Sequence, residues 1–156
     1  MAEFTTTTDE ILVGLDIGTS KTMVVLSDGE IVRNELGGIS TASLVAFHSS
    51  ERLIGEAGVQ QASANPQTAV SKLNRLVGMT EETYQGDVIS QVARFPVSFG
   101  EGGRLVLGPL ACHGGAEQTF SPEAVLAMLL VKLGRQLAAK APAAPAAAPR
   151  LALAVP

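Results

Sequence analysis

The sequence predicts a mixed α/β fold, because strand-like and helix-like segments alternate along its 156 residues. Two short apolar segments, residues 11–15 and 22–26, flank a tight Gly-Thr-Ser turn and indicate a pair of strands. Leucines recur at helical spacing between residues 126 and 137 and indicate an amphipathic helix. A hydrophobic content of 46% is enough for one globular domain with a sizeable core.

The first part of the chain predicts a meander of three strands after a polar tail, residues 1–10. The two apolar segments pair as the first two strands. Ser27-Asp28-Gly29-Glu30 then supplies an Asp-Gly turn, which is a strong hairpin signal. We expect residues 31–34 to form the third strand.

The middle of the chain predicts short strands and helices separated by clear breakers. We expect strands over residues 44–47 and 52–54, and helices over residues 56–64 and 67–76. Pro66 ends the first of these helices, because proline disfavours the helical conformation in the residue before it. Gly78 is the C-terminal stop of the second.

The last part of the chain predicts two strands, a long helix and a final strand. We expect the strands over residues 88–99, 103–110 and 151–155. Ser121 is the expected cap of the helix, and Pro122 fits its first turn. Between Lys140 and Arg150 the chain contains alanine and proline alone, and repeated proline predicts an extended segment there.

Composition excludes several classes of function. The net charge of −4, without a basic cluster, predicts no nucleic-acid partner. A single cysteine excludes an internal disulfide and fits a reducing compartment. No apolar run approaches the ~20 residues of a membrane helix, so no membrane partner is expected. The first residues lack the order of a signal peptide, and we expect a cytoplasmic protein.

A carboxylate and a glycine-containing turn follow the first strand in a pattern suited to a metal–triphosphate. Asp16 ends the strand, and Gly18, Thr19, Ser20 and Lys21 follow it. Glycine permits a φ that other residues resist, so that backbone amides can turn toward an anion. On these residues alone, a plain β-hairpin remains the alternative, since glycine and serine are common in turns. The segment is neither a Walker loop nor a dinucleotide-binding fingerprint.

Several segments together resemble one known family. They are residues 14–20 (GLDIGTS), 43–47 (SLVAF), 51–57 (ERLIGEA), 65–70 (NPQTAV), 75–78 (RLVG) and 120–123 (FSPE). In this order they resemble the N-terminal lobe of the DnaK-type, seventy-kilodalton heat-shock chaperones, within the actin and sugar-kinase superfamily. Many kinases share the phosphate loop, whereas the ERLIG and Asn-Pro segments are far more specific to the chaperones.

The resemblance implies an RNase-H-like first lobe of the actin and heat-shock ATPase type, incomplete here, with an inserted small α+β subdomain. Residues 1–43 and 116–156 would form the RNase-H-like subdomain, and residues 44–115 the inserted upper subdomain. Family members continue into a second phosphate loop, an adenosine pocket, a catalytic glutamate and a peptide-binding domain. We therefore expect an N-terminal fragment that is inactive by itself.

The resemblance also implies the ligands and the partners of a stress-response chaperone. ATP and Mg²⁺ are the expected cofactors, with Asp16 holding the metal through water. Gly18, Thr19, Ser20 and Lys21 are the expected phosphate-binding residues. Expected partners are ATP or ADP, and co-chaperones or client proteins that bind through the missing domains.

Asn74 is the most consequential departure from the family pattern. Hydrolysing members carry a lysine here, whose ammonium stabilises the charge that develops on the transferred phosphoryl group. An amide cannot supply that charge, so we expect Asn74 to be catalytically non-functional. Lys72 is two residues away, about 200° around a helix, and is not expected to substitute. Arg75 has its own counterpart in the family.

Three functions remain open from the sequence. The first is an ATP-hydrolysing chaperone, of which this chain is the N-terminal piece. The second is a non-hydrolysing nucleotide-binding scaffold or co-chaperone of the same family, of the ribosome-associated type, which Asn74 favours. The third is an enzyme of the sugar- or acetate-kinase type, which the segments at residues 51–56 and 65–66 disfavour.

Overall fold

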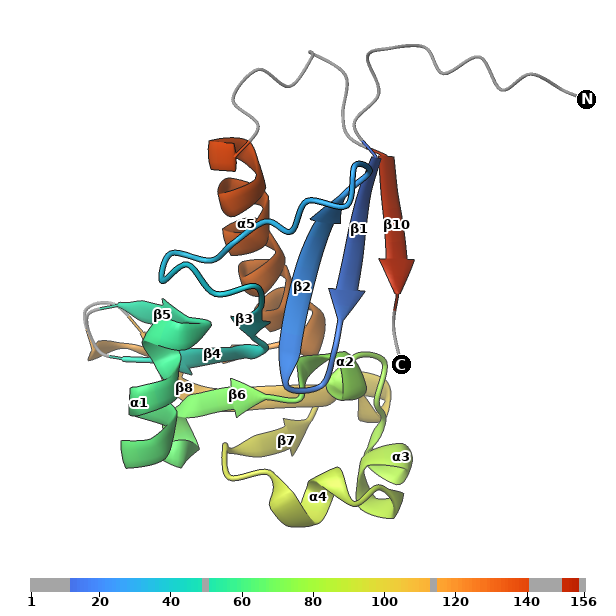
Figure 1. Cartoon of the computed structure of the whole chain (residues 1–156). Helices are drawn as coiled ribbons and strands as arrows, with labels where there is room; N and C mark the ends of the chain where they lie inside the picture. The colour runs from blue at the N-terminus through green and yellow to red at the C-terminus, as the bar shows by residue number, and fades with distance from the viewer. Residues whose placement is uncertain (1–11, 49–50, 113–114, 141–149, 155–156) are drawn as a thin grey trace, which may run out of the picture.

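The computed structural model describes residues 12–48, 51–112, 115–140 and 150–154. Figure 1 shows the elements in chain order. The strands are β1 (Leu12–Ile17), β2 (Lys21–Leu26), β3 (Thr41–Ala42), β4 (Leu44–Phe47), β5 (Arg52–Ile54), β6 (Ala69–Ser71), β7 (Val97–Phe99), β8 (Leu105–Ala111), β9 (Glu117–Phe120) and β10 (Arg150–Ala154). The helices are α1 (Glu56–Ala64), α2 (Leu73–Leu76), α3 (Glu81–Gly86), α4 (Ile89–Val92) and α5 (Pro122–Lys140), with 3-10 turns η1 (Pro66–Thr68) and η2 (Glu101–Gly103).

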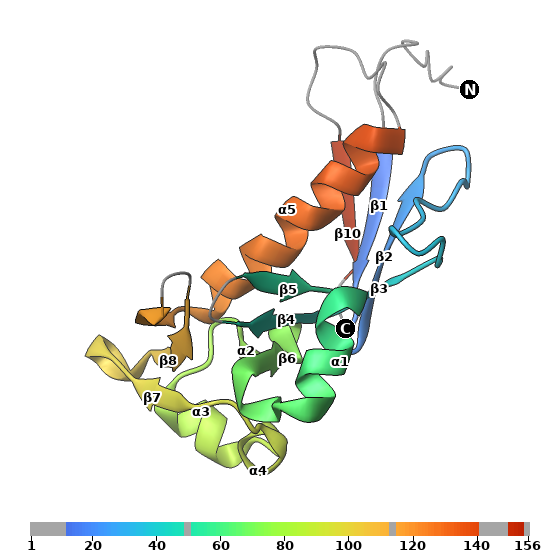
Figure 2. The same cartoon turned by 90° about the vertical axis from the view of Figure 1, so that its left-hand side faces the viewer.

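Within the described ranges the strands form three sheets. The first has the order β10-β1-β2-β3, with β10 parallel to β1 and the other pairs antiparallel. The second, β5-β4-β6, and the third, β7-β8-β9, are antiparallel throughout. In Figures 1 and 2 the first sheet and the end of α5 form the upper part of the molecule, and α1–α4 lie below.

Both predicted N-terminal strands are confirmed, as is the final strand. β1 and β2 pair antiparallel, with Ile17 opposite Thr22 beside their shared turn. At the far end of β2, Gly29 turns the chain with a φ of 86°, and the Leu26 amide donates to the carbonyl of Glu30. β10 adds to the free side of β1 as a parallel strand. The predicted segments at residues 44–47, 52–54 and 56–64 have the expected structure and bounds.

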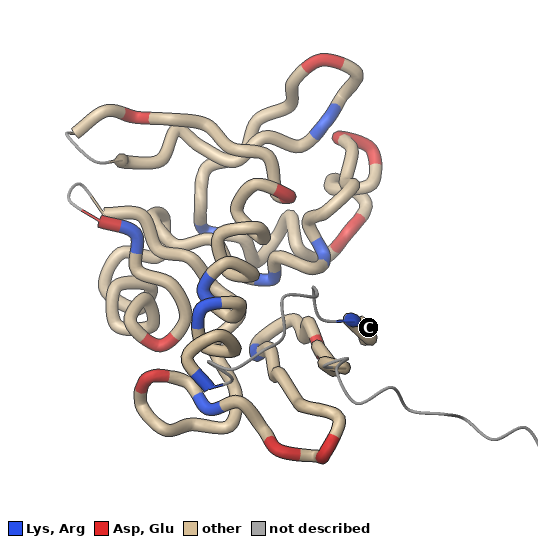
Figure 3. The backbone as a smooth tube through the Cα atoms, turned by 90° about the horizontal axis from the view of Figure 1, so that it is seen from above, with Lys and Arg blue, Asp and Glu red and all other residues tan. Residues whose placement is uncertain are grey.

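Helix α5 begins at the predicted cap and buries one side. The hydroxyl of Ser121 accepts a hydrogen bond from the Ala124 amide at 3.2 Å, which satisfies one donor of the first turn. Val125, Leu129 and Leu133 are buried, and the helix contacts β4, β5, β8 and α2. It also covers one face of the first sheet, and no described helix covers the other face (Figures 1 and 2). Lys and Arg residues lie along α5, whereas Asp and Glu residues lie mainly on the surrounding turns (Figure 3).

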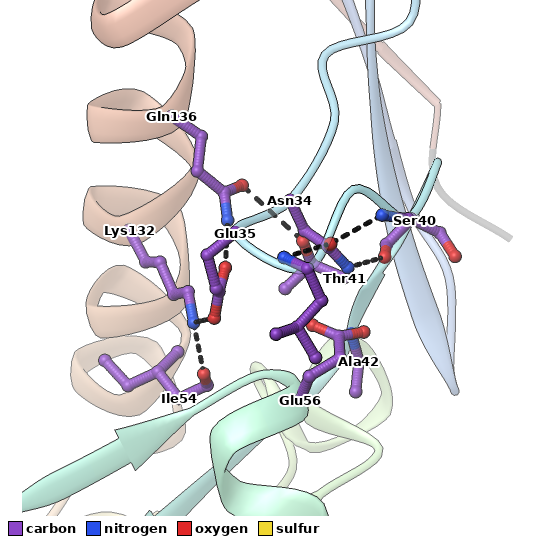
Figure 4. Close-up of polar contacts among 11 residues, drawn as sticks. Asn34, Glu35, Ser40, Thr41, Ala42, Ile54, Glu56, Lys132 and Gln136 are labelled. Atoms are coloured by element: carbon purple, nitrogen blue, oxygen red, sulfur yellow. Dashed lines mark hydrogen bonds and ion pairs between the residues drawn. The ribbon is translucent and has the colours of Figure 1, made fainter.

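The predicted third strand at residues 31–34 is wrong. A single bridge at Ile31 is all that joins this segment to β2, and the later strand β3 takes the edge instead. The side chain of Asn34 is the cause, because it captures backbone groups that a strand would pair. Its Oδ1 accepts from the Gly38 amide at 2.8 Å, and its Nδ2 donates to the Ser40 carbonyl at 2.7 Å (Figure 4).

The loop that Asn34 turns is tied to α5 by charged and amide side chains. The carboxylate of Glu35 pairs with the ammonium of Lys132 and accepts from Gln136 Nε2 at 2.8 Å (Figure 4). Lys132 also donates to the carbonyl of Ile54. This lysine therefore joins the loop, the helix and β5.

Most of the predicted helix at residues 67–76 is wrong. Its last four residues are helical, as α2, but β6 occupies the middle of the segment and pairs with β4. Val70 is fully buried opposite Val45, and its branched side chain suits a pleated surface better than a helix. Lys72 then adopts the left-handed conformation, with a φ of 57°, and separates β6 from α2.

The predicted strand at residues 88–99 is wrong over most of its length. Asp87 Oδ1 accepts from the Ile89 amide at 2.8 Å and starts α4, so that the strand is limited to β7. Helix α3 was not predicted; Thr80 caps it and exchanges hydrogen bonds with Thr83. The predicted strand at residues 103–110 is confirmed as β8. The expected tail at residues 1–10 and the Ala/Pro-rich residues 141–149 lie outside the described residues.

Truncating the buried side of α5 should destabilise the protein. Leu129 has no exposed surface, and we expect Leu129→Ala to lower the free energy of unfolding by about 2–5 kcal/mol. Val131, on the same helix, is 54% exposed, and Val131→Ala should change stability by less than about 0.5 kcal/mol. Urea denaturation followed by circular dichroism measures both. Equal losses in the two variants would contradict the packing described for α5.

Candidate functional site

The candidate phosphate loop is the connection between β1 and β2, residues 18–20. A Cβ atom on Gly18 would lie 2.5 Å from the carbonyl oxygen of Lys21, closer than a side chain tolerates. The φ of Gly18 is not positive, so the expectation that this glycine serves for its φ is wrong. Glycine is needed here because the two strands approach closely at their turn.

Ser43 fixes the base of the loop from the short connection between β3 and β4. Its amide donates to the Ser20 carbonyl at 2.9 Å. Its hydroxyl lies 2.8 Å from the hydroxyl of Thr22, and both side chains are buried. Sequence reasoning did not select Ser43 as a site residue, although it begins the SLVAF segment of the family resemblance.

Asp16 presents an exposed carboxylate one residue before the end of β1. It pairs with Met23 of β2 and Ala154 of β10, so strands flank it on both sides. It borders an open groove of about 310 Å³ on the first sheet, which Met23 and Val25 also line. Ser20 and Lys21 are exposed as well. The sequence-predicted metal and phosphate residues therefore lie together at one end of the β1–β2 hairpin.

The carboxamide of Asn74 lies directly against the loop. Its Nδ2 donates to the carbonyl of Ile17 at 3.1 Å and to the hydroxyl of Thr19 at 3.4 Å. Its Oδ1 is buried, and no described residue donates a hydrogen bond to it. A buried acceptor without a donor costs about 1–3 kcal/mol, so this oxygen is suited to a donor such as a water molecule. Asn74 therefore contacts the loop through its amide nitrogen.

Arg75, which follows Asn74, is engaged elsewhere. Its guanidinium contacts both carboxylate oxygens of Asp87 at 2.7 and 2.8 Å. The Ile89 amide and this guanidinium hold the pKa of Asp87 below its usual value. The pair fixes α2 to the start of α4. Because the guanidinium of Arg75 is directed to Asp87, it is the neutral amide of Asn74 that contacts the loop.

Lys72 differs from the sequence-based expectation. It was placed about 200° from Asn74 on a continuous helix, but in the structure it precedes α2 and is left-handed. That helical separation is therefore wrong, because β6 interrupts the predicted helix.

The sequence matches one protein family over most of its length. A sequence model of the family described as Hsp70 protein matches residues 12–145 of the chain. The chain belongs to the Hsp70 family. This membership confirms the resemblance and the fold class, an incomplete lobe of the actin-like ATPase type. It also favours the chaperone family over the sugar- or acetate-kinase alternative.

Individual Hsp70 relatives match most of the chain. A human heat shock 70 kDa protein 7 is 36% identical over 130 residues, which cover 80% of this chain and 34% of the relative. A heat shock protein of Pyricularia oryzae is 36% identical over 126 residues, covering 78% and 20%. A ribosome-associated molecular chaperone of Saccharomyces cerevisiae is 35% identical over 125 residues, with the same coverage. The chain thus spans between a fifth and about a third of the length of these relatives.

Three features of the loop region bear on its chemistry. Asp16 is an exposed carboxylate, Gly18 allows a close approach to the Lys21 carbonyl, and Asn74 has a buried oxygen without a donor among the described residues. Among the helices that the structure describes, none combines the length and apolar character needed to cross a membrane.

The ion pair between Arg75 and Asp87 should give the stability of the protein a defined pH dependence. Because the pKa of Asp87 is lower in the folded state, its contribution is complete above the unfolded pKa of about 3.9 and is lost as the pH falls through the folded pKa. Asp87→Asn should therefore lower the melting temperature at pH 7, and the difference from the parent should narrow below pH ~4. Thermal denaturation between pH 7 and pH 3 measures this.

Glu117→Gln is the matched control, since it removes one exposed carboxylate of β9. Its difference from the parent should change less over the same pH range. A melting-temperature difference for Asp87→Asn that is constant with pH would contradict the ion pair.

Proposed function

We propose that this chain provides the first phosphate-binding loop of an ATP-binding Hsp70-family chaperone. The observation that carries the proposal is the grouping of the exposed Asp16 carboxylate, the loop and the Asn74 amide at one end of the β1–β2 hairpin. The buried Asn74 Oδ1 could accept a hydrogen bond from a water bound to the metal, since phosphate oxygens are acceptors and cannot donate to it. The activity and the partners of a whole Hsp70 protein belong to this proposal.

The proposed roles follow from the chemistry of each group. Asp16 would hold Mg²⁺ through water, because carboxylate oxygen is a preferred environment for this hard cation. The amides and hydroxyls of Gly18, Thr19, Ser20 and Lys21 would bind phosphate oxygens. Bound Mg²⁺–ATP would supply the reactive phosphoryl group. Asn74 would orient the Thr19 hydroxyl and accept a hydrogen bond through Oδ1.

The loop should show weak and magnesium-dependent nucleotide binding in this chain. We expect this chain to contribute one phosphate loop and no adenosine pocket. Mg²⁺–ATP should therefore bind to it with a dissociation constant of about 1 mM or weaker. Nuclear magnetic resonance on ¹⁵N-labelled protein should locate the amide shifts at residues 18–21. Asp16→Ala should abolish the magnesium dependence of these shifts without changing the fold.

Asp28→Ala is the control, since Asp28 is an exposed aspartate at the other end of β2. It should leave the shifts unchanged. If Asp16→Ala responded to Mg²⁺–ATP as the parent does, Asp16 would be an ordinary turn residue.

The second candidate is a nucleotide-binding scaffold or co-chaperone that hydrolyses ATP slowly or not at all. Asn74 favours it, because the group beside the loop is neutral and Arg75 is paired with Asp87. Relatives named ribosome-associated chaperones make a ribosome-linked role the specific form of this candidate. For either candidate we propose a cytoplasmic location in the stress response. Co-chaperones and client proteins would bind through parts outside this chain.

Asn74→Lys distinguishes the two candidates. In the complete protein, ATP hydrolysis should be slow, and the substitution should raise the rate. Loss of one preorganised stabiliser of transition-state charge costs on the order of a hundred- to a thousand-fold in rate. Single-turnover hydrolysis with and without the substitution measures the effect. Rapid hydrolysis by the parent would show that another cation serves the site, and slow rates in both would favour the scaffold.

A further inference from the structure

A groove of about 340 Å³ runs between the outer side of α5 and strand β5. Its apolar lining comes from Ile54, Met128, Val131 and two alanines of α5. Arg52 and two further basic residues of α5 complete the lining. None of the lining residues belongs to the phosphate loop, so this surface is separate from the proposed nucleotide site.

The groove is basic although the chain is acidic. Arg52, Lys132 and Arg135 line it, no acidic residue does, and the chain as a whole has a net charge of −4. The ammonium of Lys132 is already bound to Glu35 and to a β5 carbonyl. In the described part of the chain, no ion pair involves Arg52 or Arg135. These two guanidinium groups are therefore available to an acidic ligand, and Figure 3 shows the basic character of α5.

Arg52 is held in place before any ligand binds. Its guanidinium carbon lies 5.5 Å from the centroid of the Phe120 ring, in cation–π geometry. The Phe120 ring in turn packs on Phe47, with the two centroids 5.1 Å apart. A guanidinium that is already positioned loses less conformational freedom when it binds a carboxylate.

The floor of the groove suits a second helix. Ala124, Ala127 and Val131 are exposed and follow one another along α5 at helical spacing. The small alanine side chains allow the backbone of a partner helix to approach closely. Val131, which is 54% exposed, adds branched apolar surface to the floor.

We propose that this groove binds an acidic amphipathic helix of a partner protein. Leucine-like side chains of that helix would cover Val131 and Met128, and its carboxylates would pair with Arg52 and Arg135. An apolar floor with two available cations suits such a helix better than a nucleic acid, which needs a long row of phosphate contacts. The proposal is independent of ATP binding.

The test uses the whole chain and a labelled synthetic helix with leucine at every third or fourth position and flanking glutamates. Fluorescence anisotropy should show saturable binding that weakens with salt, as screening requires. The double variant Arg52→Gln/Arg135→Gln should weaken binding roughly tenfold. Val131→Asp should weaken it comparably, because it places a like charge on the floor. Thermal melts should show that these exposed substitutions preserve the fold.

Arg94→Gln is the matched control, because Arg94 is exposed and does not line the groove. It should leave binding unchanged. The proposal would be overturned by no binding to the parent, or by equal weakening in the Arg94 variant. Tighter binding of a glutamate peptide without leucines, or of an oligonucleotide of the same charge, would also overturn it, because simple anion attraction would then suffice.

Discussion

The buried side of α5 is the contact on which the arrangement of the three sheets depends. The sheets share no strand among the described residues, so side-chain packing rather than a hydrogen-bond ladder sets their relative positions. Val125, Leu129 and Leu133 form one stripe, and the helix contacts strands of the second and third sheets as well as α2. Since α2 carries Asn74, this packing also decides whether the amide reaches the loop of the first sheet.

Sequence reasoning succeeded where local signals and tertiary contacts agree. Helix α1 has the predicted bounds because Pro66 ends it and no sheet competes for its residues. It failed where one long-range or side-chain interaction overrides local preference. Val70 lies in a strand because it pairs with Val45, which is distant in sequence. Asn34 and Asp87 bond nearby amides and turn the chain where apolar composition indicates strands.

In the candidate site, too, local features were predictable from the sequence and long-range contacts were not. Asp16 and the loop were selected from the order of residue types within one short segment, and they lie at one end of the β1–β2 hairpin. The position of Asn74 was available only through the family resemblance, because 57 residues separate it from Ile17. The unpaired Oδ1 has no sequence signal, since it results from the burial of one atom after folding. Ser43 was missed because a serine just before a predicted short strand looks like an ordinary connection.

Ser43 links the loop mechanically to the second sheet. The amide of Ser43 is hydrogen-bonded to Ser20, and its hydroxyl to Thr22. The next residue in the chain begins β4, the central strand of the second sheet. No residue separates Ser43 from the first residue of β4, so the connection from the loop to the second sheet is direct. A rotation of the second sheet against the first would therefore pull directly on the backbone of Ser20 or break its bond to Ser43. The conformation of the loop therefore depends on the angle between the two sheets.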